Sequence, residues 1–278
     1  MKGDYLVTRR TVQCAIIFGI CFIYFPTRIV AQQAGVQTNH VAQIRTLAKQ
    51  LRWQTESGRK HYEAEKAELT RNVLSEVDQY ITETFVPDSV TAEQVQSGLN
   101  NLLGYTKGLG IQNVAFLANL PKGDFLIVGI DLWRGGAAIN EDYICFRAYA
   151  DIGGKFVHVA GTENLVASDS FLVGVNARAL EPPPIAGEFW FLSWADVPPQ
   201  SPYTIAIRLY AFDGKKFRTI WAPQNIISAS IDTAVQVGPG GVFTVNQMPT
   251  WTSQDIVHGQ YAVSTTGPKK VREWKTAR

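Results

Sequence analysis

The chain has few cysteines, which limits its covalent chemistry. Only three occur in 278 residues, and Cys14 and Cys21 lie in the N-terminal leader. The remaining Cys145 has no partner for an internal disulfide, even in an oxidising compartment. It lies between aromatic and aliphatic neighbours, so we predict a packed side chain rather than a nucleophile.

Motifs for metal, nucleotide or nucleophile chemistry are also lacking. The four histidines, His40, His61, His158 and His258, are scattered, with no HExxH and no CxxC. There is also no P-loop and no GxSxG. The sequence therefore predicts no metal site, no cofactor and no identifiable catalytic residue.

The first 31 residues have the pattern of a signal peptide. A basic leader precedes the apolar run Cys14–Phe25, and small Ala31 ends a more polar segment. Twelve helical residues rise about 18 Å, too short for a hydrocarbon core of about 30 Å. We expect export to the periplasm or the exterior and no membrane span after cleavage; an uncleaved anchor is the alternative. Arg9 and Arg10 leave both the general and the twin-arginine export routes open.

Charge is unevenly distributed along the chain. The leader carries a net charge of +3, whereas the whole chain carries +2. The rest of the chain therefore has a net charge near −1. A nucleic-acid partner is therefore not expected, because it requires a basic face. Residues 265–278 are predicted to be a basic, solvated C-terminal tail. Its cations are Lys269, Lys270, Arg272, Lys275 and Arg278.

Residues 32–106 have helical periodicity. Two apolar stripes recur at intervals of three and four residues. The first consists of Ile44, Leu47, Ala48 and Leu51, and the second of Leu69, Val73, Val77, Tyr80 and Ile81. A third helix is predicted to begin at the capping box Thr91–Gln94 and to end at Gly104.

Residues 110–264 have the pattern of an antiparallel β domain. Short β-branched and aromatic runs alternate with turn residues, without crossover helices. We expect about ten strands between residues 114 and 245, one of them over Ser228–Val235. The fold class is thus α+β, mainly β, with amphipathic helices preceding the β domain.

The β domain contains an internal repeat. Residues Arg147–Phe156 match Arg208–Phe217 at an offset of 61. We predict two duplicated hairpin units, and we expect their apolar faces to pack as a sandwich. The apolar faces comprise Ile144, Phe146 and Ala148 in one unit and Ile205, Ile207 and Leu209 in the other.

The segment Arg208–Trp221 resembles the inner hairpin of β-propeller blades in secreted bacterial repeat proteins. The likeness implies the hairpin itself and no site residues. Two units are too few to close a ring of about four to eight blades. A sandwich, an assembly of several chains, and a purely local likeness all remain open.

Two sets of side chains are candidates for binding. Trp190 and Trp194 share a strand face about 13 Å apart, which would suit two sugar rings or a peptide. Core packing is the alternative, and it is favoured because β-sheet cores bury aromatics. The second set pairs Arg147 with Tyr149 and Arg208 with Tyr210, either as a binding surface or as two solvent-facing ladders.

The leading hypothesis is a secreted or periplasmic, non-catalytic β module for ligand binding or envelope assembly. Its expected partner is a polysaccharide or another envelope protein. The alternative is an extracellular hydrolase acting on glycans, for which Glu188 and Asp196 are the candidate acids. A third possibility is an assembly subunit that pairs through Leu69, Val73, Val77 and Ile81. The oligomeric state stays open.

Overall fold

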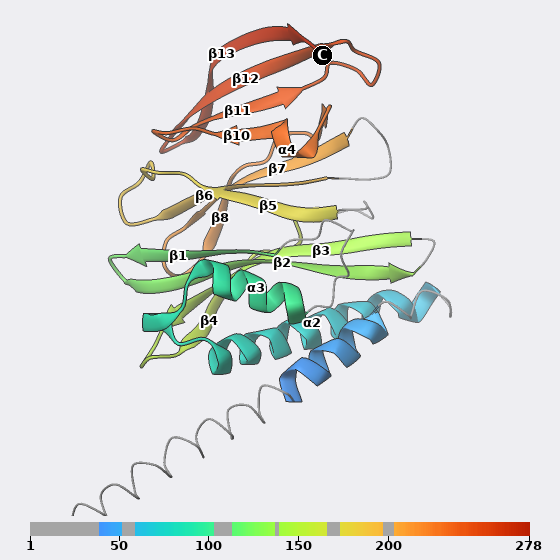
Figure 1. Ribbon diagram of the computed structural model, residues 1–278, viewed down its shortest axis with the longest axis vertical. Coiled ribbons are helices and arrows are strands. Elements are labelled where there is room, and N and C mark those ends of the chain that lie inside the picture. Colours follow the sequence, from blue (N-terminus) through green and yellow to red (C-terminus); the bar gives the residue numbers. More distant parts are fainter. Residues whose placement is uncertain (1–38, 52–58, 103–112, 137–138, 166–172, 197–202) are drawn as a thin grey trace, which may run out of the picture.

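Figure 1 shows the computed structural model of the chain. It describes residues 39–51, 59–102, 113–136, 139–165, 173–196 and 203–278. The predicted signal peptide and the predicted helix end at Gly104 lie outside these ranges. Within them, no helix is long and apolar enough to cross a membrane.

The helices come first in the chain. A helix over residues 39–51 is followed by α2 (Arg59–Thr84), the 3₁₀ turn η2 (Pro87–Ser89) and α3 (Ala92–Leu102). The expected capping box starts α3. The Thr91 amide donates to Oε1 of Gln94 at 2.9 Å, and the Gln94 amide donates to Oγ1 of Thr91 at 3.3 Å.

Antiparallel sheets make up most of the rest of the described chain. The first sheet contains β1 (Val114–Leu120), β2 (Gly123–Gly136), β3 (Ile139–Asp151) and β4 (Phe156–Gly161) in that order. The second contains β5 (Val173–Ala179), β6 (Phe189–Asp196), β7 (Tyr203–Phe212) and β8 (Phe217–Trp221), with β9 (Ile226–Ser228) also paired to β7. The third contains β10 (Val235–Val237), β11 (Val242–Gln247), β12 (Asp255–Ser264) and β13 (Gly267–Ala277). The mainly β fold with N-terminal helices is confirmed.

The sheets and helices are stacked in layers (Figure 1). One apolar cluster joins the helices to the first sheet, and it includes the predicted stripe residues Ile44, Val73, Val77 and Ile81. A second cluster lies between the first and second sheets, and a third between the second and third sheets. Each internal face is therefore covered by the neighbouring layer.

The layers follow the order of the chain because β3 and β7 direct corresponding faces toward the preceding and the following layer. Ile144, Phe146 and Ala148 of β3 face the second sheet. The matching residues of β7, Ile205, Ile207 and Leu209, face the third sheet. The opposite face of β3 carries Tyr149 toward the helices, and that of β7 carries Tyr210 toward the first sheet.

Two sequence predictions need correction. The strand expected over Ser228–Val235 is divided, because Oγ of Ser230 accepts from the Asp232 amide and caps the short helix α4 (Ile231–Ala234) between β9 and β10. The expected tail is strand β13 over most of its length. Its many exposed cations do not alternate with apolar residues, so the sequence lacks the pattern that would have predicted this edge strand.

Candidate functional site

The two tryptophans proposed as a platform lie in the core. Trp190 is completely buried and Trp194 is 5% exposed, both between the second and third sheets. Trp221 also packs inward, against Phe243 and Tyr261, with ring centroids 5.7 and 5.4 Å apart. The core alternative therefore describes these residues, and no exposed aromatic platform forms on β6.

Glu188, one of the two candidate acids, is bound in an ion pair. Its carboxylate accepts from the Arg218 guanidinium at 2.6 Å and from Nε1 of Trp190 at 2.9 Å. A carboxylate held by a cation and an indole is not positioned as a free general acid. The second candidate, Asp196, ends β6, and its side chain lies outside the described part of the structure.

Arg147 and Tyr149 are held by Asp78, a residue that sequence reasoning did not select. Nε of Arg147 donates to Oδ1 of Asp78 at 2.8 Å, and a second guanidinium nitrogen pairs with Oδ2. The Tyr149 hydroxyl also donates to Oδ1, at 2.7 Å. Because Asp78 lies on α2 and the other two lie on β3, this cluster fastens the helical layer to the first sheet.

The electrostatics of this cluster follow from its burial. Burial raises the pKa of Tyr149 well above its ordinary value, and the Asp78 charge raises it further. Burial opposes the charge on Arg147, yet the hydrogen bond to Asp78 and the electrostatic interactions with Tyr149, Asp78 and Cys145 together outweigh it and raise the pKa of the guanidinium. The bidentate pair is therefore permanently charged on the arginine side.

His158 borders this cluster on the same face of the sheet. Its ring meets Tyr149 edge-on, with centroids 5.6 Å apart. Burial lowers the pKa of His158, and the nearby Arg147 charge lowers it further. The imidazole is therefore neutral near neutral pH, and it serves as packing beside the ion pair.

The second pair, Arg208 and Tyr210, has a different environment. Tyr210 is 4% exposed and stacks on Phe191, with centroids 5.3 Å apart. Burial raises its pKa to about 12. One guanidinium nitrogen of Arg208 donates to the Ile207 carbonyl at 2.8 Å. These residues lie between two sheets, whereas Arg147 and Tyr149 lie under a helix, so the four do not form one surface.

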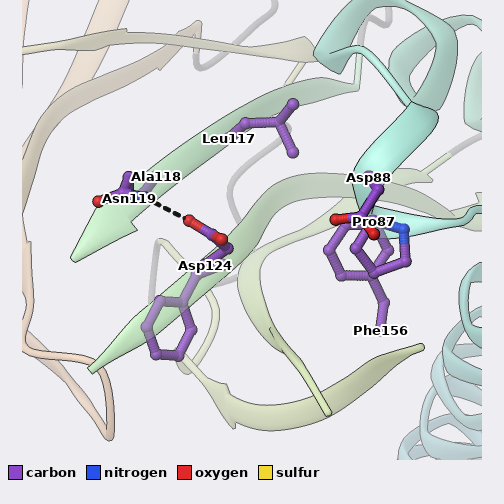
Figure 2. A pocket seen from close by; sticks show the side chains of 8 residues that line it. Pro87, Asp88, Leu117, Ala118, Asn119, Asp124 and Phe156 are labelled. Carbon is purple, nitrogen blue, oxygen red and sulfur yellow. Dashed lines mark hydrogen bonds between the residues drawn. The ribbon is translucent and has the colours of Figure 1, made fainter. Parts of the chain in front are cut away.

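Figure 2 shows a small hollow where η2 meets the hairpin of β1 and β2. Its volume is about 190 Å³. Asp88 comes from the η2 side and Asp124 from β2, where Oδ1 accepts from Nδ2 of Asn119 at 2.6 Å. Leu117, 46% exposed, adds an apolar wall. The hollow combines two carboxylates with apolar side chains, and sequence reasoning missed it because its walls are 29 or more residues apart.

Groups of three or more His, Cys, Asp or Glu that could hold a metal ion do not occur among the described residues. Cys145 is buried, and burial raises the pKa of its thiol to about 12. A thiol in that environment stays protonated, so it is a packing residue rather than a ligand or nucleophile.

The sequence matches no protein-family model, and comparison with curated proteins and with solved structures finds no match.

Proposed function

We propose that this protein is an exported, non-catalytic β module that binds a ligand or a partner in the cell envelope. One observation carries the proposal. Two partly buried ion pairs, Asp78–Arg147 and Glu188–Arg218, each join segments that are far apart in the sequence. Charges used in this way maintain the fold, and they leave binding to the outer surfaces.

The proposal includes an evolutionary relation among the sheets. In each sheet, the register between the third and fourth strands shifts immediately before a tyrosine, at Tyr149, Tyr210 and Tyr261. Each tyrosine is followed by alanine, and the first two shifts are 61 residues apart, as the sequence repeat requires. We take the β domain as a stack of duplicated units, in the manner of a sandwich extended by one sheet.

Export and binding can be tested together. The full chain is expressed with a C-terminal tag, and cells are fractionated while mass spectrometry reads the N-terminus. The purified protein is then mixed with a panel of polysaccharides, and both retained protein and released reducing ends are measured. We expect protein outside the cytoplasm and retention without new reducing ends. A cytoplasmic, uncleaved protein would contradict the proposal.

The hollow in Figure 2 is the observation that favours the second candidate, an extracellular hydrolase acting on glycans. Two carboxylates from different walls are the minimum that glycoside hydrolysis needs. If reducing ends are released, Asp88→Asn and Asp124→Asn should each abolish the release while Glu68→Gln, on the exposed side of α2, should not. If reducing ends are still released by both variants, the hollow is not the site of hydrolysis.

A further inference from the structure

The third sheet is the last layer of the described stack, and its two faces differ in chemistry. The inner face packs on the second sheet through Phe243, Val245, Tyr261 and Val263. Since side chains alternate along a strand, the register places the intervening residues on the outer face. Its polar and aromatic members are Gln236, Thr244, Asn246, His258, Gln260, Ser264, Lys269, Arg272, Trp274 and Thr276. This set contains no acidic residue.

Positive charge is concentrated at this end of the molecule. Residues 267–278 hold five cations and one carboxylate, for a net charge of +4. Residues 32–266 carry a net charge of −5. A few lysines are enough to protect an edge strand from pairing. Separation of charge on this scale creates a field that attracts an anion to one face.

The single carboxylate of this segment is directed to the other face. Lys270 lies opposite Tyr261 and above its ring, with Nζ 5.9 Å from the centroid, which places it on the inner side. It forms an ion pair of 2.7 Å with Glu273. The register shift at Gln260 and Tyr261 makes Val271 the extra residue of a bulge. Lys269 and Arg272 are thereby left together on the outer face, without Glu273.

Trp274 is held in position on the outer face. The His258 ring stacks on it, with centroids 5.0 Å apart and planes 10° apart, and the Arg272 guanidinium lies 5.0 Å from its ring. Nδ1 of His258 is 2.7 Å from Oδ1 of Asn246, an acceptor, so this nitrogen donates. Its Nε2 is 2.7 Å from Oγ1 of Thr276. These contacts fix the imidazole, and with it the tryptophan.

The outer face of the third sheet differs in composition from the corresponding faces of the first and second sheets. Counted back from the tyrosine at each register shift, Phe146 and Ile207 correspond to His258, and Ala148 and Leu209 correspond to Gln260. These residues of the first and second sheets, Phe146, Ala148, Ile207 and Leu209, are buried against the sheet that follows. Polar residues at the same positions of the third sheet rule out another sheet of this kind as its partner.

We propose that the outer face of the third sheet binds an acidic polysaccharide. This inference rests on the proposed binding function and names its ligand class. Arg272 and Lys269 would pair with sugar carboxylates, Trp274 would supply an apolar edge for a ring, and Thr244, Gln260 and Thr276 would meet hydroxyls. A nucleic acid is less suitable, because tight binding uses roughly six to ten phosphate contacts. The outer face supplies two cations, Lys269 and Arg272.

The test measures affinity for polygalacturonate, a polymer of carboxylated sugars, with the purified full chain at 150 mM salt. We expect binding, and we expect Arg272→Gln and Trp274→Ala each to weaken it at least about tenfold. The matched control is Lys275→Gln, which removes the same charge from the same strand on the inner face. It should change affinity less than about twofold. Arg272 is exposed, so its variant should fold even if the Trp274 variant does not.

Each other outcome overturns the proposal at a defined point. Equal losses from Arg272→Gln and Lys275→Gln would mean general attraction to the strand rather than a face. Equal affinity for neutral dextran, for double-stranded DNA or for phosphatidylglycerol vesicles would refute the ligand class. Binding to a neutral polysaccharide alone would leave the proposed binding function intact and refute this inference. No retention by any polymer or envelope fraction would refute both.

Discussion

Removal of the Asp78 carboxylate is the sharpest test of how the helical layer is held. Asp78→Ala would leave the Arg147 guanidinium and the Tyr149 hydroxyl without their shared acceptor between α2 and β3. Loss of one partner from a buried pair costs about 3–5 kcal/mol in the free energy of unfolding. Arg147 is 14% exposed and Asp78 21%, so water screens the loss in part. We therefore expect about 3 kcal/mol, the lower end of that range.

The free energy of unfolding from urea titration, followed by circular dichroism, measures this effect. For a protein of this size, about 3 kcal/mol corresponds to a fall in Tm of roughly 6–12 °C. Glu68→Ala is the matched control, because it removes an exposed carboxylate from the same helix. It should stay within about 0.5 kcal/mol of the parent.

A second comparison separates the ion pair from the packing around it. The combined variant Asp78→Leu, Arg147→Met, Tyr149→Phe replaces the whole polar cluster by apolar groups of similar size. Such replacements are often neutral, so most of the stability lost in Asp78→Ala should return. If Asp78→Ala costs less than about 1 kcal/mol, the contact is peripheral and the reasoning fails.

Three further predictions follow from packing and burial. Gly129→Ala should lower the free energy of unfolding by about 1–3 kcal/mol, because the added Cβ would lie 2.7 Å from the Phe146 ring. Gly161→Ala is the control and should cost little, because its added Cβ would lie 3.6 Å from its nearest neighbour. Equal losses of stability in urea titration would contradict this prediction. Burial lowers the pKa of His158 below 6.5, so the unfolded chain binds a proton that the folded chain does not. Stability should therefore fall as the pH drops below about 6.5, and a His158→Gln variant with an unchanged slope would refute the assignment. Burial raises the pKa of Cys145 to about 12, so its peptide should stay unmodified by a thiol reagent at pH 8 until urea unfolds the chain; rapid native modification would contradict the burial.

Local patterns predicted most of the elements. The stripe through Val73, Val77 and Ile81 is the buried face of α2, and the Thr91 capping box starts α3. These signals succeed because they depend on residues a few positions apart. Strands β12 and β13 were missed as a pair, since their outer residues are polar or charged and give no alternation.

The candidate site was predictable only in part. The paired Arg147 and Tyr149 are marked by the repeat, but the residue that decides their role, Asp78, is 69 positions away from Arg147. A helix-to-sheet contact of this length leaves no periodicity in the sequence. Whether Trp190 is buried or exposed likewise depends on whether a third sheet covers β6. That sheet was not predicted as a sheet, because no strand was expected after residue 245 and residues 265–278 were interpreted as a tail.

The two ends of the stack differ because the sheets all have the same orientation. Each sheet turns the tyrosine of its third strand toward the preceding layer and the alternate face toward the following one. At the first sheet α2 takes the place of a preceding sheet, and Asp78 satisfies the groups that face it. At the third sheet no described layer follows, and apolar positions become His258 and Gln260. A stack covered by helices at one end and bounded by a polar sheet face at the other needs no ring of blades to bury its apolar faces, and that polar, cationic face is the one for which we propose recognition.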